Sequence, residues 1–458
     1  MGKDFRYTKE EQQRNRVLAY QSQQLNQIDF DASDLDECIS SSEKLLKSLG
    51  KDSELRSVKI ASQTKTSDYE SSITLAIPDW ESLCAEANNL IKEDVPLTSF
   101  FTEKELITNR LYIEQLNHDY NSIHHLDKID WTICIVSGII SAAVDILLVG
   151  MPKGPTKVGT QAGPLSNYIR AYFEKKFPPK EMEALGRQSF VKTPYDAQDN
   201  RNTTEYVEGL SSFYHRLLSL GHDPFLGFFV GVLDIMRGTM TTIDKNGKIV
   251  SQIMDVYSNR KETSIFQALI KQLLHLKSDL TTSMGLPVPL MSLFNLFQFG
   301  SIGEENKTIA QIVQEMYYEG YDFTHFCSMS IPVMLTEVFV RISWSIKRIK
   351  KDGYSIKESI PFSLNRERKP KLATMLFTAH SIATAINAGK VFFTKNPLAI
   401  NYPQWLAFAK YAFSQLKWSL YKKPELRDRF VMGKIMDERV GILEEINKNY
   451  DEFCRLSF

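Results

Sequence analysis

The chain has 458 residues, of which 43% are hydrophobic and 24% are charged, and its 55 basic side chains balance its 55 acidic ones. This composition is typical of a globular protein with a buried core, and the neutral balance argues against nucleic-acid binding, which needs a basic excess. The five cysteines are scattered and form no C-x-x-C pair, so they predict neither a disulfide framework nor a zinc site.

Residues 1–100 are polar and rich in Gln, Ser, Asp and Lys, which suits a regulatory or partner-binding region. Ser33, followed by Asp36, predicts the start of a helix that Gly50 ends. Two alternating runs, 57–61 and 72–77, have the pattern of a small hairpin. The N-terminus is too polar for a signal peptide, so we expect a protein of the cytoplasm or of the cytoplasmic face of the inner membrane, and not a secreted one.

Residues 101–458 are expected to form a helical core, which begins with a capping box of Thr102 and Glu105 and a helix to about His125. The dipeptide Asn246-Gly247 predicts a β-hairpin over 241–250. The stretch 151–202 is expected to be a connection with one helix at 166–177. Further helices are predicted near 132–150, 204–220, 224–240, 263–277, 287–299, 308–319, 330–350, 371–393, 403–421 and 424–449. The predicted fold is mainly α: a large helical bundle with a small β-hairpin and a polar N-terminal region.

The segment 132–150 is nearly uncharged and has about the length that crosses a bilayer core. Trp131 precedes it and Lys153 follows it, as interfacial residues do. Asp145 within it opposes insertion by about 2.5–3.5 kcal/mol at a helix centre, and by less at its off-centre position. The segment is therefore either a membrane helix or the central helix of a soluble bundle.

The spacing of small residues and an acid in this segment recurs in 224–240. The repeated residues are Gly138, Ala142 and Asp145 in the first segment and Gly227, Gly231 and Asp234 in the second. Each set lies on one helix face, so the two helices can pack closely, with two acids that bind a cation or a proton. The alternative is that Asp234 is neutralised by Arg237, and Asp145 by a basic side chain elsewhere.

A Gly-His-Asp-Pro turn is predicted to join helices 204–220 and 224–240. Gly221 suits a left-handed helix end, Asp223 an N-cap and Pro224 a first helical position. His222 in this turn and His215 nearby suggest a catalytic or metal site, but no partner residue stands close in sequence. We therefore assign no catalytic residue, metal or cofactor. His124 and His125, close to Asp127 and Asp130, are better explained as a solvated helix end.

The region 341–371 holds ten Lys or Arg against three acids, and its densest part is Lys347, Arg348, Lys350 and Lys351. Such a patch is either a solvated helix end or a contact with anionic lipid or phosphate. The phosphate-loop, dinucleotide, G-x-S-x-G, H-E-x-x-H, EF-hand and kinase patterns are all absent from the sequence. A helical enzyme that assembles its site from scattered residues remains compatible with that absence.

The run from His215 to Phe228, together with 145–150 (Asp-Ile-Leu-Leu-Val-Gly), resembles a pattern in uncharacterised bacterial proteins associated with mobile elements. The resemblance covers about 130–415 and implies a shared helical core, but it brings no established activity. We expect a membrane-associated, toxin-like effector of a defence or mobile-element system, acting through the 132–150 helix. Its partners would be membrane lipid and a protein bound by the N-terminal region. The alternative is a soluble scaffold or interaction protein, and a hydrolase centred on His222 and Asp223 is a more distant one.

Overall fold

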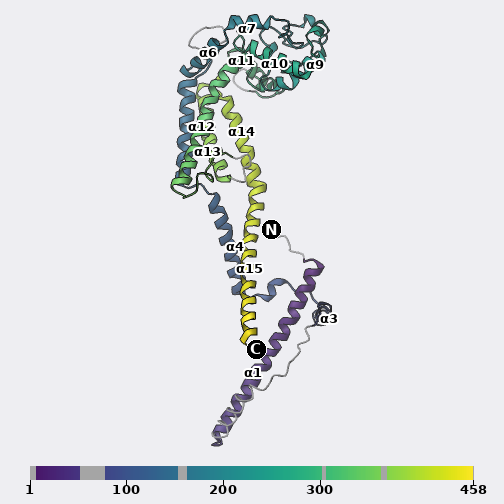
Figure 1. Cartoon of the computed structure of the whole chain (residues 1–458), viewed down its shortest axis with the longest axis vertical. Helices are drawn as coiled ribbons and strands as arrows, with labels where there is room; N and C mark the ends of the chain where they lie inside the picture. Colours follow the sequence, from purple (N-terminus) through teal and green to yellow (C-terminus); the bar gives the residue numbers. More distant parts are fainter. Residues whose placement is uncertain (1–6, 52–77, 153–161, 302–305, 363–368, 457–458) are drawn as a thin grey trace. The chain divides into compact units, whose positions relative to one another are not determined.

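The computed structural model describes residues 7–51, 78–152, 162–301, 306–362 and 369–456 (Figure 1). The chain divides into two compact units, residues 1–118 and residues 119–458. In the described ranges the protein is mainly α-helical with one two-stranded antiparallel sheet, so the predicted fold class is confirmed.

The first unit is built on the long helix α1 (Lys9–Ser48), which packs against α3 (Trp80–Leu90). Thr8 and Glu11 form the capping box at the start of α1, so the helix start predicted at Ser33 is wrong: the helix runs through that position. Gly50 does end the helix, at φ 73°. The short η1 (Leu97–Phe100) follows. The hairpin predicted over 57–77 lies outside the described residues.

Helix α4 (Glu103–His124) leads from the first unit into the second. Its predicted capping box is present, because the Glu105 carboxylate accepts a hydrogen bond from Thr102 N–H and the Thr102 hydroxyl accepts one from Glu105 N–H. The long α15 (Lys423–Leu456) ends the described chain.

Four helices of the second unit form what we call the bundle. They are α5 (Lys128–Val144), continued by a π turn (η2, Asp145–Val149); α12 (Phe323–Lys350); α13 (Pro370–Thr394); and α14 (Tyr402–Lys417), continued by a π turn (η10, Trp418–Lys422). In Figure 1, α12, α13 and α14 run side by side, and α13 also contacts α5. Cys134, Val340, Trp344, Met375 and Leu376 lie in the core between them.

Charged groups inside the bundle are paired with one another. Asp145 Oδ2 accepts hydrogen bonds from Lys390 Nζ (2.9 Å) and Asn387 Nδ2 (3.0 Å). Lys347 Nζ lies 2.6 Å from oxygens of both Asp127 and Asp130. Each buried charge thus has an opposite charge within hydrogen-bonding distance, as burial requires.

Between α5 and α12 the chain folds into what we call the lobe, residues 162–322. Its helical elements are α6 (Pro164–Lys176), α7 (Pro179–Gly186), η3 (Asn200–Asn202), α8 (His215–Leu218), η4 (Leu220–His222), η5 (Leu226–Phe228), α9 (Val230–Arg237), η6 (Asp255–Arg260), α10 (Ile265–Asp279), η7 (Met291–Leu296) and α11 (Ile309–Tyr318). The short η9 (Pro397–Ala399) lies between α13 and α14. The buried core of the lobe includes Tyr195, Val207, Leu218, Ile235 and Met240.

The predicted hairpin is confirmed as β1 (Thr239–Ile243) paired with β2 (Ile249–Ile253). Asp244 Oδ1 accepts hydrogen bonds from Asn246 N–H and Lys248 N–H in the turn, and Gly247 adopts φ 81°. An asparagine followed by a left-handed glycine is therefore what reverses the chain here.

Several predicted helices of the lobe are wrong. Residues 204–214 form turns, so the helix predicted over 204–220 is limited to α8. The segment 287–299 forms only the 3-10 helix η7, and the segment 224–240 splits into η5, α9 and the start of β1. Gly209 and Gly238, at φ 78° and 72°, supply the reversals that an apolar pattern alone does not reveal. The stretch 151–202 contains α7 in addition to the expected helix α6.

Candidate metal centre

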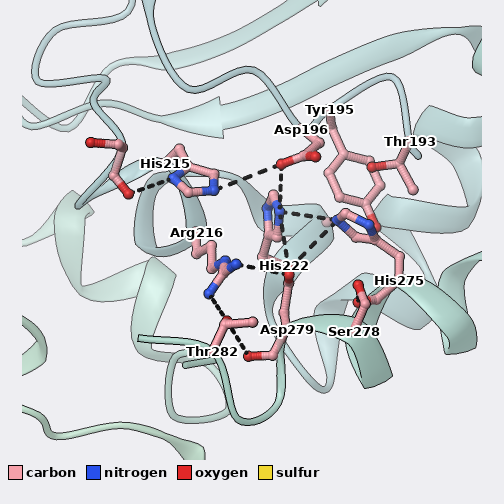
Figure 2. Close-up of polar contacts among 12 residues, drawn as sticks. Thr193, Tyr195, Asp196, His215, Arg216, His222, His275, Ser278, Asp279 and Thr282 are labelled. Carbon is pink, nitrogen blue, oxygen red and sulfur yellow. Dashed lines mark hydrogen bonds and ion pairs between the residues drawn. The ribbon is translucent and has the colours of Figure 1, made fainter. Parts of the chain in front are cut away.

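Three imidazoles and two carboxylates converge in the lobe (Figure 2). His215 lies on α8 and His222 ends η4, while His275 and Asp279 stand one turn apart on α10. Asp196 lies in the segment that follows α7. We call these five residues the His/Asp cluster; four of the five are buried and Asp196 is half-buried.

The distances in the cluster match those between ligands of one ion. His222 Nε2 lies 3.2 Å from His275 Nε2, 3.6 Å from Asp196 Oδ1 and 3.7 Å from Asp279 Oδ2. His215 Nε2 lies 3.7 Å from Asp196 Oδ1. Metal–ligand bonds of about 2.1 Å place neighbouring ligand atoms roughly 3.0–3.5 Å apart. Each of the two groups of three ligand atoms, Asp196–His215–His222 and His222–His275–Asp279, therefore has nearly the spacing of ligands around one ion.

Two of the ligand atoms, His215 Nε2 and Asp279 Oδ2, lack a hydrogen-bond partner in the described part of the chain, whereas His222 Nε2 and His275 Nε2 lie within hydrogen-bonding distance of each other. His215 Nδ1 lies 3.0 Å from the Ser212 carbonyl and donates its proton to it, so the lone pair of His215 resides on Nε2. That Nε2 and Asp279 Oδ2 are buried without a hydrogen bond among the described residues. A carbonyl that fixes the imidazole tautomer is the usual outer support of a metal-bound histidine.

The electrostatic environment holds His215, His275 and Asp196 in the protonation states in which they can bind a metal ion. Burial lowers the pKa of His215 to about 4, with further lowering from His222 and Arg216. Burial also lowers the pKa of His275, against the attraction of Asp279 and Asp196. Burial alone would raise the pKa of Asp196, but its contacts with the three imidazoles outweigh that and hold the pKa below its usual value. At neutral pH the imidazoles of His215 and His275 are therefore neutral and the Asp196 carboxylate is charged, as metal ligands must be.

The Gly-His-Asp-Pro segment is held rigidly beside the cluster. Gln272 Nε2 donates to the Gly221 carbonyl at 2.7 Å, and Gln272 Oε1 accepts from the Tyr195 hydroxyl. A Cβ on Gly221 would lie 2.7 Å from the Tyr195 ring, which also packs edge-on against His222. Gly221 is thus required by close packing, since it lies inside η4 and does not have a positive φ. The predicted left-handed helix end is wrong.

The predicted role of Pro224 is also wrong. Asp223 Oδ1 accepts hydrogen bonds from Phe225 N–H and Leu226 N–H, but Pro224 lies in a turn. The next helical element, η5, begins at Leu226 and its N-cap is Phe225, so Pro224 is not a first helical position. Asp223 is not a member of the His/Asp cluster, so His222 is joined by Asp196 and Asp279 and not by its chain neighbour.

The two small-residue faces contact different helices and do not form the expected pair. A Cβ on Gly138 would meet Ile382 of α13, and the next turn carries the buried Ala142. Gly227 and Gly231 instead face Gln272 of α10.

The two acids of the repeat also have different partners. Asp234 is buried and accepts hydrogen bonds from Thr239 and Thr241; the described residues contain no ion pair between it and Arg237. Asp145 forms an ion pair with Lys390. This agrees with the alternative drawn from the sequence, in which a basic side chain from elsewhere in the chain neutralises Asp145.

The predicted basic patch is not one uniform surface. Lys347 is buried against Asp127 and Asp130, and Lys351 lies 4.0 Å from Asp127. Arg348 stacks on Trp344 and Tyr354, whereas Lys350 is exposed. The His124 ring contacts the rings of Tyr120 and Trp418.

Sequence analysis missed His275, Asp279 and Asp196. The first two stand at i and i+4 on one helix, a spacing that places two ligands on the same face and was readable in the sequence. Asp196 lies in a segment without periodicity, and only the fold brings it to the histidines.

Comparisons with protein-family models, with curated proteins and with solved structures gave no match. The function is therefore argued from the chemistry of the cluster itself.

Proposed function

We propose that the protein is a metal-dependent hydrolase whose ion is bound by the His/Asp cluster. The observation that carries this proposal is the two overlapping groups of three ligand atoms that share His222, in which His215 Nε2 and Asp279 Oδ2 are buried without a hydrogen bond. Three imidazoles with two carboxylates suit a first-row transition ion such as Zn²⁺, Mn²⁺ or Fe²⁺ better than Mg²⁺ or Ca²⁺.

His222 is common to the two groups of ligand atoms in the cluster. The two overlapping groups are Asp196–His215–His222 and His222–His275–Asp279. Because an imidazole nitrogen has one lone pair, His222 Nε2 binds one ion, so we propose one ion per chain. Held by His222 and the other members of one group, that ion keeps coordination positions for water or substrate.

The chain's own residues orient and neutralise the site. A bound ion would supply Lewis acidity and lower the pKa of its water. Asp196 and Asp279 offset its charge, and Arg216 fixes Asp279 by donating to Oδ1 at 2.8 Å. Arg216 is itself held by the Thr282 hydroxyl at 2.6 Å, so the carboxylate that faces the ion has a defined orientation.

Metal binding by the full-length chain tests the proposal. After removal of metal with a chelator, we expect one Zn²⁺ or Mn²⁺ per chain by elemental analysis, and metal-dependent cleavage of at least one p-nitrophenyl ester. His222→Ala and Asp279→Ala are expected to lose the ion. His325→Ala is the matched control, because His325 Nε2 is likewise buried without a partner but belongs to no group of ligand atoms in the described chain. Absence of binding by a folded wild-type chain would overturn the proposal.

We also propose that the bundle lies in a membrane, as a second candidate function that retains the membrane-associated effector expected from the sequence. By length and composition, α12 and the helical stretch Glu103–Val149, which contains α5, are able to cross a bilayer. Only 39% of the apolar window containing α5 and 28% of that in α12 are buried, so these windows differ from ordinary core helices.

The distribution of side chains on α5 and α12 supports lipid contact. No charged residue of α5 after Lys128 is exposed, nor any in α12 before Lys350. Ser137, Ser141, Asp145 and Thr336 face inward, whereas the outward residues are large and apolar: Ile135, Ile139, Leu147, Met334, Val338 and Ile342. Polar groups inside and apolar groups outside are the arrangement that a lipid environment favours.

Fractionation of expressing cells tests the second proposal. We expect the wild-type chain to stay with membranes after carbonate washing, and Ile139→Lys combined with Val338→Lys to reduce that fraction. Ile139→Val combined with Val338→Ile is the matched control. Recovery of the wild-type chain as a monodisperse particle without detergent would contradict membrane insertion and favour the scaffold alternative.

A further inference from the structure

A cavity of about 500 Å³ opens beside the His/Asp cluster. Asp196, His275 and Asp279 contribute to its wall, so an ion held by the cluster would face this space. The volume falls in the range of sites for small molecules. Its wall is predominantly polar and includes the hydroxyls of Ser278, Thr282 and Ser283, which excludes an apolar substrate.

Basic side chains dominate the remaining wall. They are Arg187, Lys192, Arg201, Arg216 and Arg260. Arg201 pairs with Asp199, and Arg216 pairs with Asp279. Arg260 donates to the Thr193 carbonyl and stacks on Tyr257.

Three cations of the wall have no acidic partner. Within the described residues, Arg187, Lys192 and Arg260 form no ion pair, and of these Arg260 is already held by the Thr193 carbonyl. Glu183 is the one acidic lining residue beyond the cluster and Asp199. With a divalent ion in place, the cavity thus presents a surplus of positive charge. Such a surplus favours a substrate that brings more than one negative charge.

A phosphate monoester meets these requirements better than other esters. It carries up to two negative charges, and its oxygens can bind a metal ion and a guanidinium together. A phosphodiester carries one charge and a carboxylic ester none. We propose that the cavity binds a phosphomonoester of small-molecule size, with its phosphoryl group between the ion of the His/Asp cluster and the side chains of Arg187 and Lys192. This inference rests on the proposed metal-dependent hydrolase.

The reaction balances without a further reactant. A water oxygen forms a new bond to phosphorus and the ester P–O bond breaks. The leaving alkoxide takes a proton from the water, so that phosphate and an alcohol are the products. Inorganic phosphate is therefore both a product and a probe of the cavity.

Kinetics of the full-length, metal-loaded chain test the substrate class. We expect cleavage of p-nitrophenyl phosphate in preference to bis(p-nitrophenyl) phosphate and p-nitrophenyl acetate, with competitive inhibition by inorganic phosphate. Arg187→Ala and Lys192→Ala are each expected to raise KM for the monoester about tenfold, with an unchanged metal content. Lys180→Ala, which removes an exposed lysine of α7 outside the cavity wall, is the matched control.

The outcomes separate this inference from the function on which it rests. A chain that binds one ion but prefers the diester or the acetate ester would overturn the phosphomonoester proposal and leave the hydrolase standing. Equal KM values for the wild type and for both the Arg187→Ala and the Lys192→Ala variants would overturn it as well. A folded chain that binds no ion would overturn both proposals.

Discussion

The bundle and the lobe both bury ionisable groups, but they satisfy them in opposite ways. In the bundle, each buried acid named above meets a cation, as Asp145 meets Lys390 and Asp130 meets Lys347. In the lobe, three imidazoles and two carboxylates face one another, and Arg216 reaches only the outer oxygen of Asp279.

This difference indicates a structural role for the buried charges of the bundle and a chemical role for those of the lobe. A buried acid with a cationic partner holds helices together and needs nothing further, whereas His215 Nε2 and Asp279 Oδ2 are buried without a hydrogen bond and can accept the ion that we propose. Under these proposals the bundle is a scaffold, in lipid or in protein, and the chemistry occurs in the lobe. The two regions should respond differently to substitution and to metal.

The largest effect is expected in the bundle. Lys390→Met removes the cation beside Asp145 and leaves a buried carboxylate held only by amides, which should lower the free energy of unfolding by about 3 kcal/mol. Denaturant titration in detergent measures this. Lys390→Met combined with Asp145→Leu should recover part of the loss, because no uncompensated charge then stays buried. A loss below about 1 kcal/mol for the single variant would show that the pair is not a structural requirement.

The sequence contained much of the bundle but little of the site. Apolar periodicity located α5, α12, α13 and α14, because long helices repeat their pattern over many turns. It also suggested that Asp145 needs a basic partner, but not which one, since Lys390 stands far along the chain. The ends of the helices were less readable where glycines such as Gly209 reverse the chain.

In the lobe we expect a smaller change in stability, and it should be a gain caused by metal binding. Zn²⁺ or Mn²⁺ at about a hundred times its dissociation constant should stabilise the wild-type chain by about 2.7 kcal/mol. His222→Leu should abolish that gain, and in metal-free buffer it should change stability little, because the hydrogen bond that it removes joins only two imidazoles. Thermal unfolding with and without metal checks both statements, and His325→Leu serves as the control. Equal stabilisation of the His222→Leu variant would place the ion elsewhere.

The site in the lobe could not be predicted from the sequence because its ligand residues are far apart in the chain. His215 and His222 were noticed because they flank the Gly-His-Asp-Pro segment, but their partners arrive from α10 and from the segment after α7. No local pattern connects Asp196 to His275, and the partners of His215 and His222 are too distant in the sequence to form a familiar metal motif.

The smallest expected effect tests whether the support around the cluster matters. A Cβ at Gly231 would lie 2.6 Å from Gln272 Oε1, so Gly231→Ala should displace the side chain that fixes Gly221 beside His222. We expect metal affinity to fall about tenfold, as for other losses of outer support, measured by competition with a chromogenic chelator. Gly389→Ala is the matched control, because a Cβ there meets no atom within 4 Å.

A glycine substitution in the bundle is the comparison for Gly231→Ala. Gly138→Ala would bring a Cβ within 2.8 Å of Ile382, so it should lower stability by about 1–3 kcal/mol. It should leave metal affinity unchanged, because α5 carries none of the ligands. If Gly138→Ala weakened metal binding as much as Gly231→Ala does, the support of the cluster would extend into the bundle, and the division between scaffold and chemistry would have to be abandoned.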